Sequence, residues 1–324
     1  MLPLLNKKLM KSFNFLLTII CLCCFYSISK SQYKPSHSLS MLNNYLINPA
    51  IAGPEPYMDL KISGRNQWVG IDGSPVTYYV SLDTPLNFVE NDRNPQAHHA
   101  VGGTLLTDKA GPFRRNELNL SYAYHVPITS EITLSAGLSI GALHYNLKTA
   151  DLNPNDPNDM VIGSGNDNKF SPNLSTGLWL YSDRFQLGIS IHQLFIGDTN
   201  FGFLPSTNRR SQNINYFLFG SLKLKSITKV SISPVVMIKK IDYSPMAIDI
   251  GVTFNYNNRV MAGLTYENFD SVGLLGSFYF SPLLSLGYYY KVLGEGFVQY
   301  SRGSHEIVLG LKLKNKPNIV CPKF

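Results

Sequence analysis

Between Ala247 and Tyr256 the chain alternates strictly between apolar residues and polar or small ones. The apolar set is Ile248, Ile250, Val252, Phe254 and Tyr256, and the other set is Ala247, Asp249, Gly251, Thr253 and Asn255. A β-strand points successive side chains to opposite faces, so this run predicts a strand with one apolar face and one polar face. Its ten residues match the roughly 9–11 that a tilted strand needs to cross a bilayer.

The same alternation recurs along the chain, for example over 131–142 and 185–192. We expect about 14 strands, near 57–66, 75–84, 98–107, 114–125, 131–145, 173–182, 184–194, 213–224, 228–239, 246–256, 258–268, 271–280, 284–292 and 304–313. The polar faces carry small or wettable residues, which suit a lumen. The sequence therefore predicts an all-β fold, a transmembrane antiparallel β-barrel in which Ile250 faces lipid.

Residues 1–31 resemble a cleaved signal peptide, with Lys7, Lys8 and Lys11 ahead of an apolar run from Phe13 to Phe25. The run is shorter than the ~20 residues of a spanning helix, and a lipoprotein signal is an alternative because cysteines lie within it. Cleavage would lower the net charge from +7 to +3, so the basic pI is no argument for a nucleic-acid partner. Only Cys321 would remain, which excludes an internal disulfide.

The remaining chain divides into three parts. Residues 32–56 contain four prolines and form an irregular segment that could plug the lumen or reach a periplasmic partner. Residues 57–313 form the barrel, and residues 314–324 form a short tail. Outer-membrane barrels pair short periplasmic turns with longer outer loops. From the fifth expected strand onward the connections alternate in this way, which places both termini in the periplasm. The long connection 85–97 is an exception to the phase.

The polar residues offer few candidates for chemistry. Asp and Asn residues crowd the loop 146–172, where calcium binding is an alternative to a solvated loop. Ser190 and His192 with Asp198 suggest a hydrolase, but side chains two residues apart on one strand face lie roughly 7 Å apart, too far for a triad. No histidine has metal-ligand spacing. We expect no enzyme activity and no cofactor.

Three short elements go beyond a generic barrel. They are Asn43–Gly53, which contains Asn-Pro-Ala-Ile-Ala-Gly, then Arg65–Pro75, which contains Arg-Asn-Gln-Trp-Val-Gly, and Gly303–Ile307, which begins Gly-Ser-His-Glu. Together and in this order they resemble the PorP/SprF family, outer-membrane proteins of the type IX secretion system of Bacteroidetes. Upstream, where that family usually has Tyr-Met-Phe-Asn, this chain has Ser40–Asn43.

The resemblance implies an outer-membrane barrel that supports secretion and surface attachment of specific cargo proteins, often large adhesins of gliding bacteria with a C-terminal targeting domain. The implied partners are membrane lipid, such cargo and other components of the secretion system. The alternative is a channel or transporter for small hydrophobic molecules, with a lipid-modifying enzyme a distant third.

The candidate residues for partner contact or for the barrel rim come from the three matched elements. They are Asn48, Pro49, Gly53, Arg65, Gln67, Trp68, Gly70, Asp72, Gly73, His305 and Glu306. Trp68 is expected to anchor at a membrane interface. Arg65 could pair with Asp72, with Asp83 or with a carboxylate of a partner.

Overall fold

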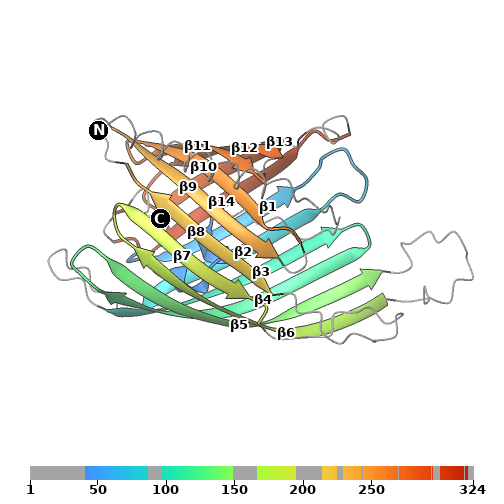
Figure 1. Ribbon diagram of the computed structural model, residues 1–324, viewed down its shortest axis with the longest axis horizontal. Coiled ribbons are helices and arrows are strands. Elements are labelled where there is room, and N and C mark those ends of the chain that lie inside the picture. Colours follow the sequence, from blue (N-terminus) through green and yellow to red (C-terminus); the bar gives the residue numbers. More distant parts are fainter. Residues whose placement is uncertain are drawn as a thin grey trace, which may run out of the picture. The chain divides into compact units, whose positions relative to one another are not determined.

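Fourteen antiparallel strands close into a barrel in chain order, and β1 completes the closure beside β14 (Figure 1). The computed structural model describes residues 41–86, 97–148, 166–194, 214–224, 229–241, 244–268, 270–292, 294, 300–316 and 318–319. The expected signal peptide at 1–31 lies outside these residues. The barrel confirms the all-β fold that the alternation predicted.

The strands follow the predicted ranges closely. They are β1 (Met58–Asn66), β2 (Val76–Leu86), β3 (His98–Ala110), β4 (Phe113–Pro127), β5 (Thr133–Lys148), β6 (Asn166–Tyr181), β7 (Phe185–His192), β8 (Asn215–Leu222), β9 (Val230–Ile241), β10 (Ala247–Tyr256), β11 (Val260–Glu267), β12 (Ser271–Tyr279), β13 (Leu284–Val292) and β14 (Ser304–Leu313). Each strand pairs with its neighbours in sequence. The first strand pairs with the last in a register that runs from Met58 opposite Leu313 to Asn66 opposite His305.

Burial alternates along the strands as the sequence predicted. On β10, Ile250 and Phe254 are exposed on the outer wall, whereas Asp249 is buried in the lumen. On β12 the outward Val272 and Leu274 are likewise exposed, and the inward Ser271 is buried. An outer-membrane barrel presents its apolar set to lipid and its polar set to the lumen.

The two ends of the barrel carry different connections. We call the end with the start of β1 and the end of β14 the terminal end, and the opposite end, which carries the β1–β2 connection, the distal end. The connections 149–165, 193–214 and 293–303 are at the distal end, and the shorter turns 128–132, 182–184, 257–259 and 280–283 are at the terminal end. These connections alternate as the sequence predicted, whereas the long connection 87–97 at the terminal end and the short connections 111–112 and 268–270 at the distal end depart from the pattern.

At the distal end, β5 and β6 continue further than the sequence indicated. Asn146 pairs with Asn168, and Lys148 pairs with Asn166, in one uninterrupted ladder. The assignment of 146–148 and 166–172 to a loop is therefore wrong, because the backbone of these residues belongs to paired strands. Residues 149–165 of the proposed calcium loop lie outside the described residues.

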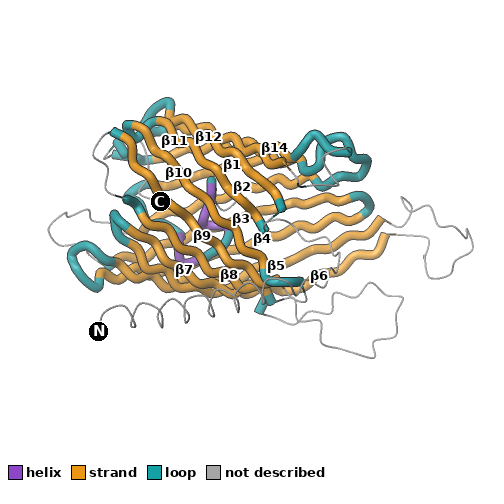
Figure 2. Tube along the Cα trace, turned by 45° about the horizontal axis from the view of Figure 1, so that its top comes forward, coloured by secondary structure: helices purple, strands orange, loops and turns teal. Residues whose placement is uncertain are grey.

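A segment of chain lies inside the barrel. Two short 3₁₀ helices, η2 (Asn44–Leu46) and η3 (Pro49–Ile51), precede β1, and η3 packs against β4, β5 and β6 (Figure 2). We call residues 41–57 the plug. Its apolar side chains form the hydrophobic core with lumenal residues of the wall, including Trp179 and Phe217. Within the described residues, no helix is long and apolar enough to cross a membrane.

Candidate functional site

Asn48 fixes the plug at its centre. Its side-chain oxygen accepts a hydrogen bond from the backbone N–H of Ala50 at 2.9 Å, which caps η3, and Pro49 occupies the first helical position. Its amide nitrogen donates to the carbonyl oxygens of Leu178 at 3.0 Å and Ile189 at 3.3 Å. Asn48 thus joins the plug to β6 and β7, and both Asn48 and Pro49 are buried.

Wall side chains bind the backbone carbonyls of the plug one after another. Ser190 and His192 both donate to Ile47, the latter at 2.7 Å; Ser135 donates to Ala50 at 2.7 Å, His125 to Ala52 at 2.8 Å and His98 to Gly53 at 3.1 Å. A plug with little regular structure leaves these carbonyls without helix or sheet partners, so the wall must satisfy them. The polar lumenal residues of β3, β4, β5 and β7 do so.

Small residues on the wall make room for this contact. A Cβ atom at Gly137 would collide with the backbone of Ala50, one at Gly177 with the side chain of Asn48, and one at Gly102 with the ring of Tyr45. Burial raises the pKa of the Tyr45 hydroxyl above its usual value.

Gly53 ends the plug in a tight bend with φ of +63°. Its N–H donates to a carboxylate oxygen of Asp83 at 2.8 Å, and a Cβ at this position would lie 2.6 Å from that of Ala100. Glycine tolerates both the left-handed backbone and the close approach. Asn48, Pro49 and Gly53 therefore lie within the lumen and contact the wall.

The other two sequence elements meet at the distal end of the β1–β14 closure. The N–H of Trp68 donates to the Ser304 hydroxyl at 3.2 Å, the N–H of Val69 donates to Gly303 at 2.9 Å, and the N–H of Arg302 donates back to Val69 at 2.8 Å. We call residues 68–74 and 300–305 the seam rim. Segments more than 200 residues apart thus form one surface.

Several seam-rim residues are exposed. Asp72, Gly70 and Gly73 face solvent, and Tyr300 is 71% exposed. Gly70 adopts φ of +105°, which bends the loop close to Tyr300. Trp68 is half-buried at this end. The exposed side chains make the seam rim a candidate contact surface.

Arg65 and Glu306 lie just inside this rim. They are direct cross-strand partners, both buried, and their opposite charges attract. Glu306 also accepts a hydrogen bond from Ser63 at 3.2 Å. Asp83 lies opposite Asp59 in the strand register. Asp59 is six residues from Arg65 along β1, a backbone distance of about 20 Å. The suggested pairing of Arg65 with Asp83 is therefore wrong.

The remaining candidates of these elements occupy different sides of the wall. Gln67 is buried, and its N–H donates to the carbonyl of Pro75 at 2.9 Å. His305 faces outward, where its ring contacts the Tyr288 hydroxyl at 2.7 Å. The three elements thus divide between the lumen, the rim and the outer wall.

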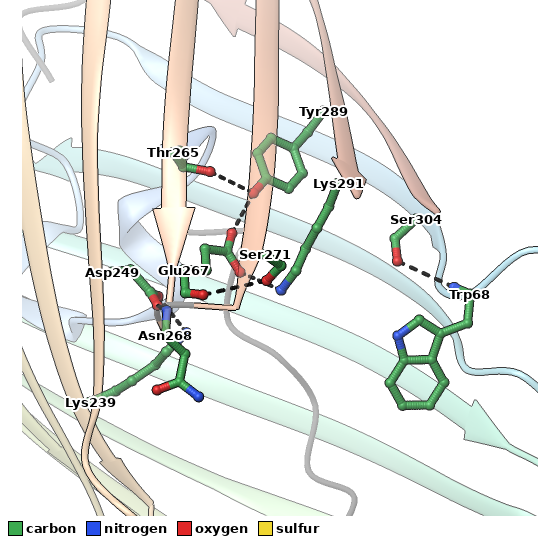
Figure 3. A network of polar contacts seen from close by, with 10 residues as sticks. All are labelled: Trp68, Lys239, Asp249, Thr265, Glu267, Asn268, Ser271, Tyr289, Lys291 and Ser304. Carbon is green, nitrogen blue, oxygen red and sulfur yellow. Dashed lines mark hydrogen bonds and ion pairs between the residues drawn. The ribbon is translucent and has the colours of Figure 1, made fainter. Parts of the chain in front are cut away.

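Buried charges continue around the distal lumen from β9 to β13 (Figure 3). Lys239 pairs with Asp249 and Lys291 pairs with Glu267, each at 2.5 Å. Tyr289 also donates to Glu267. Such pairs hold neighbouring strands in register, and removal of one partner would leave an uncompensated charge.

Cavities with some charged side chains in their lining lie on both sides of the plug. On the terminal side, a cavity of about 150 Å³ is lined in part by Lys61, Lys223 and Lys312. On the distal side, a cavity of about 50 Å³ is lined in part by Arg115 and Glu117, which form an ion pair at 2.5 Å.

The wall contacts of the plug were not predicted from sequence. Ser190 and His192, considered for a catalytic triad, instead bind one plug carbonyl, and Asp198 lies outside the described residues. Gly137 and Gly177 on lumenal faces carried the available signal, since glycine within a strand often marks a close backbone approach. Among the described residues, no group of three histidine, cysteine or acidic side chains could hold a metal ion.

Comparison with known proteins gives a family match. Residues 29–311 match the model of a family described as type IX secretion system membrane protein PorP/SprF. No curated protein matches the chain.

Similar solved structures include three outer-membrane proteins and channels. The Ralstonia pickettii toluene transporter TbuX is 10% identical over 85% of this chain and 92% of its own, with a TM-score of 0.48. The monoaromatic hydrocarbon channel CymD is 12% identical over 88% and 94%, with a TM-score of 0.47. The Acinetobacter baumannii outer membrane protein Omp33 is 7% identical over 81% and 99%, with a TM-score of 0.46. Similarity at this level says nothing about function.

Proposed function

Because the chain belongs to the PorP/SprF family of type IX secretion system membrane proteins, we propose that it supports the secretion and surface attachment of specific cargo proteins. It acts in the outer membrane through protein–protein recognition and without catalysis. Its partners are cargo proteins, such as large adhesins with a C-terminal targeting domain, and other components of the secretion system.

The main support for this proposal is that the plug occupies the lumen. Its backbone carbonyls accept hydrogen bonds from side chains of β3, β4, β5 and β7, and the side chain of Asn48 donates to a carbonyl of β6. A secreted polypeptide passing through this lumen would have to break these bonds together. Recognition at an exposed surface requires no such rearrangement, so cargo binds outside the lumen.

The seam rim is the surface we assign to cargo contact. It contains exposed side chains from two of the three family-like elements, including Asp72 and Tyr300. Aromatic residues are enriched at the centres of protein interfaces. The distal end faces the cell exterior and both termini face the periplasm, which agrees with longer loops at the distal end.

Comparative surface proteomics tests the proposal. Deletion of the gene is expected to remove one or a few specific proteins from the cell surface while general secretion continues. The double variant Asp72→Ala/Tyr300→Ala is expected to insert normally and to show the same selective loss, because it alters only exposed rim side chains.

The matched control is Ile128→Ala/Glu131→Ala, which removes one large apolar and one acidic exposed side chain at the terminal end. It is expected to leave the surface proteome unchanged. An unchanged surface proteome in the deletion strain, together with impaired uptake of an apolar nutrient, would favour the transporter alternative.

A further inference from the structure

The outward faces of β3 to β6 change character near the distal end. Leu105, Leu118, Ala142 and Pro172 are successive cross-strand partners and form an apolar row on the outer wall. The next outward rows toward the distal end are polar except for one phenylalanine. The first contains Thr107, Asn116, His144 and Phe170, and the second contains Lys109, Arg114, Asn146 and Asn168. This change marks the upper edge of the lipid-facing band.

In the second polar row, two positively charged side chains lie directly opposite each other. Lys109 and Arg114 are direct cross-strand partners beside the Gly111-Pro112 hairpin, and both are exposed. Lys148, also exposed, lies close by, because its N–H donates to the Pro112 carbonyl at 3.1 Å. Like charges directly opposite one another destabilise a sheet. Within the described residues, no acidic side chain faces outward on these four strands, so the charge is not balanced within this wall.

The polar residues are fixed by hydrogen bonds across the strands. Thr107 donates to Asn116 at 3.0 Å, Asn116 contacts the His144 ring at 3.3 Å, and His144 and Asn146 both contact the Asn168 side-chain oxygen, at 3.2 and 2.7 Å. The side chains therefore form an ordered polar surface.

An exposed aromatic ring lies at the lower edge of this surface. Phe170 is 77% exposed and stacks on His144, with ring centroids 4.4 Å apart. An apolar ring at the boundary between apolar and polar rows suits the membrane interface.

We propose that Lys109, Arg114 and Lys148, with the amide and imidazole groups beside them, bind the phosphorylated sugar headgroup of an outer-leaflet glycolipid. A phosphate between Lys109 and Arg114 would offset their repulsion and accept charge-assisted hydrogen bonds from both. Sugar hydroxyls are suited to the amides of Asn146 and Asn168. The acyl chains lie against Leu105 and Leu118, which are about half exposed.

The order of the rows explains why a lipid fits better than a free anion. Cations, amides, an aromatic ring and then an apolar wall follow one another along the strands, as phosphate, sugar and acyl chains follow one another in such a lipid. The proposal places the distal end outside, as the function proposed above does. It does not depend on cargo recognition.

Native mass spectrometry of the purified chain in detergent tests the proposal. The probes are diphosphorylated lipid A, its dephosphorylated form, phosphatidylethanolamine and inorganic phosphate. Wild type is expected to bind diphosphorylated lipid A in preference to the others. The variant Lys109→Ser/Arg114→Ser is expected to bind it at least about tenfold more weakly, because charge-assisted hydrogen bonds to phosphate are among the strong ones.

The control variant Lys229→Ser/Arg259→Ser removes two exposed cations at the terminal end. It is expected to bind lipid A as wild type does. Undiminished binding by the distal variant, or an equal loss in the control, would overturn the proposal. Binding of inorganic phosphate as tight as that of lipid A would overturn the lipid assignment. Because lipid is measured on purified protein, loss of cargo display in cells has no bearing on this result.

Discussion

At the scale of single residues, Asn48 links local and tertiary structure. Its oxygen caps η3, and its nitrogen binds two carbonyls of the wall. An amide is suited to both tasks, since it accepts through oxygen and donates through nitrogen. The Asn-Pro pair was visible in the sequence as an extended residue before a fixed φ, but its wall partners, Leu178 and Ile189, are more than 100 residues away.

We expect Asn48→Ala to destabilise the barrel by about 2–3 kcal/mol, from a lost cap of ~1 kcal/mol and two lost hydrogen bonds of ~1 kcal/mol each. Asn48→Asp keeps a good capping oxygen but presents a carboxylate to the carbonyls of Leu178 and Ile189. It is therefore expected to be at least as damaging. Urea unfolding followed by the mobility of unboiled samples on gels measures both. Wild-type stability of Asn48→Asp would show that capping is the only role of this side chain.

At the scale of elements, alternation located the strands because lipid and lumen impose opposite demands on successive residues. Its largest error is β6, which begins at Asn166 and not near 173. Asn and Asp suggest a loop, yet strands that leave the bilayer expose both faces to polar surroundings. Alternation also predicts which face points inward, but it does not predict what fills the interior. From the sequence, residues 32–56 could therefore either plug the lumen or reach a periplasmic partner.

Strand β10 offers a test of this face assignment. Ile250 is 45% exposed on the outer wall, whereas Thr253 lines the cavity on the terminal side of the plug. We expect Ile250→Arg to cost about 2–4 kcal/mol, as arginine does on a lipid face near mid-membrane. Thr253→Arg is expected to cost less, because its guanidinium can remain hydrated. Folding into lipid vesicles at graded urea concentrations measures both, and equal costs would refute the register.

At the scale of the whole molecule, orientation determines which surface meets the exterior. In a background with Cys321→Ser, a membrane-impermeant maleimide is expected to label Tyr300→Cys in intact cells. It is expected to label Ile128→Cys only after the outer membrane is permeabilised. Both positions are exposed, at the distal and terminal ends respectively. The native Cys321, which lies outside the described residues, is expected to behave like position 128. Labelling of position 128 alone in intact cells would show that the barrel has the opposite orientation in the membrane.

The plug and the seam rim together lead us to infer that cargo is recognised at the distal surface while the lumen stays occupied. The side chains of Asn43 and Ser81 are in contact at 2.8 Å, so Asn43→Cys/Ser81→Cys can be joined by a disulfide or a short thiol-reactive bridge in the Cys321→Ser background. This bridge ties the plug to β2. Cargo at the cell surface is then measured in the bridged and the reduced state, beside a strain that lacks the protein. We expect wild-type display in both states and loss in the deletion strain. Display that is lost on bridging and restored by reduction would contradict this inference, because the plug would then have to leave the lumen for the protein to function.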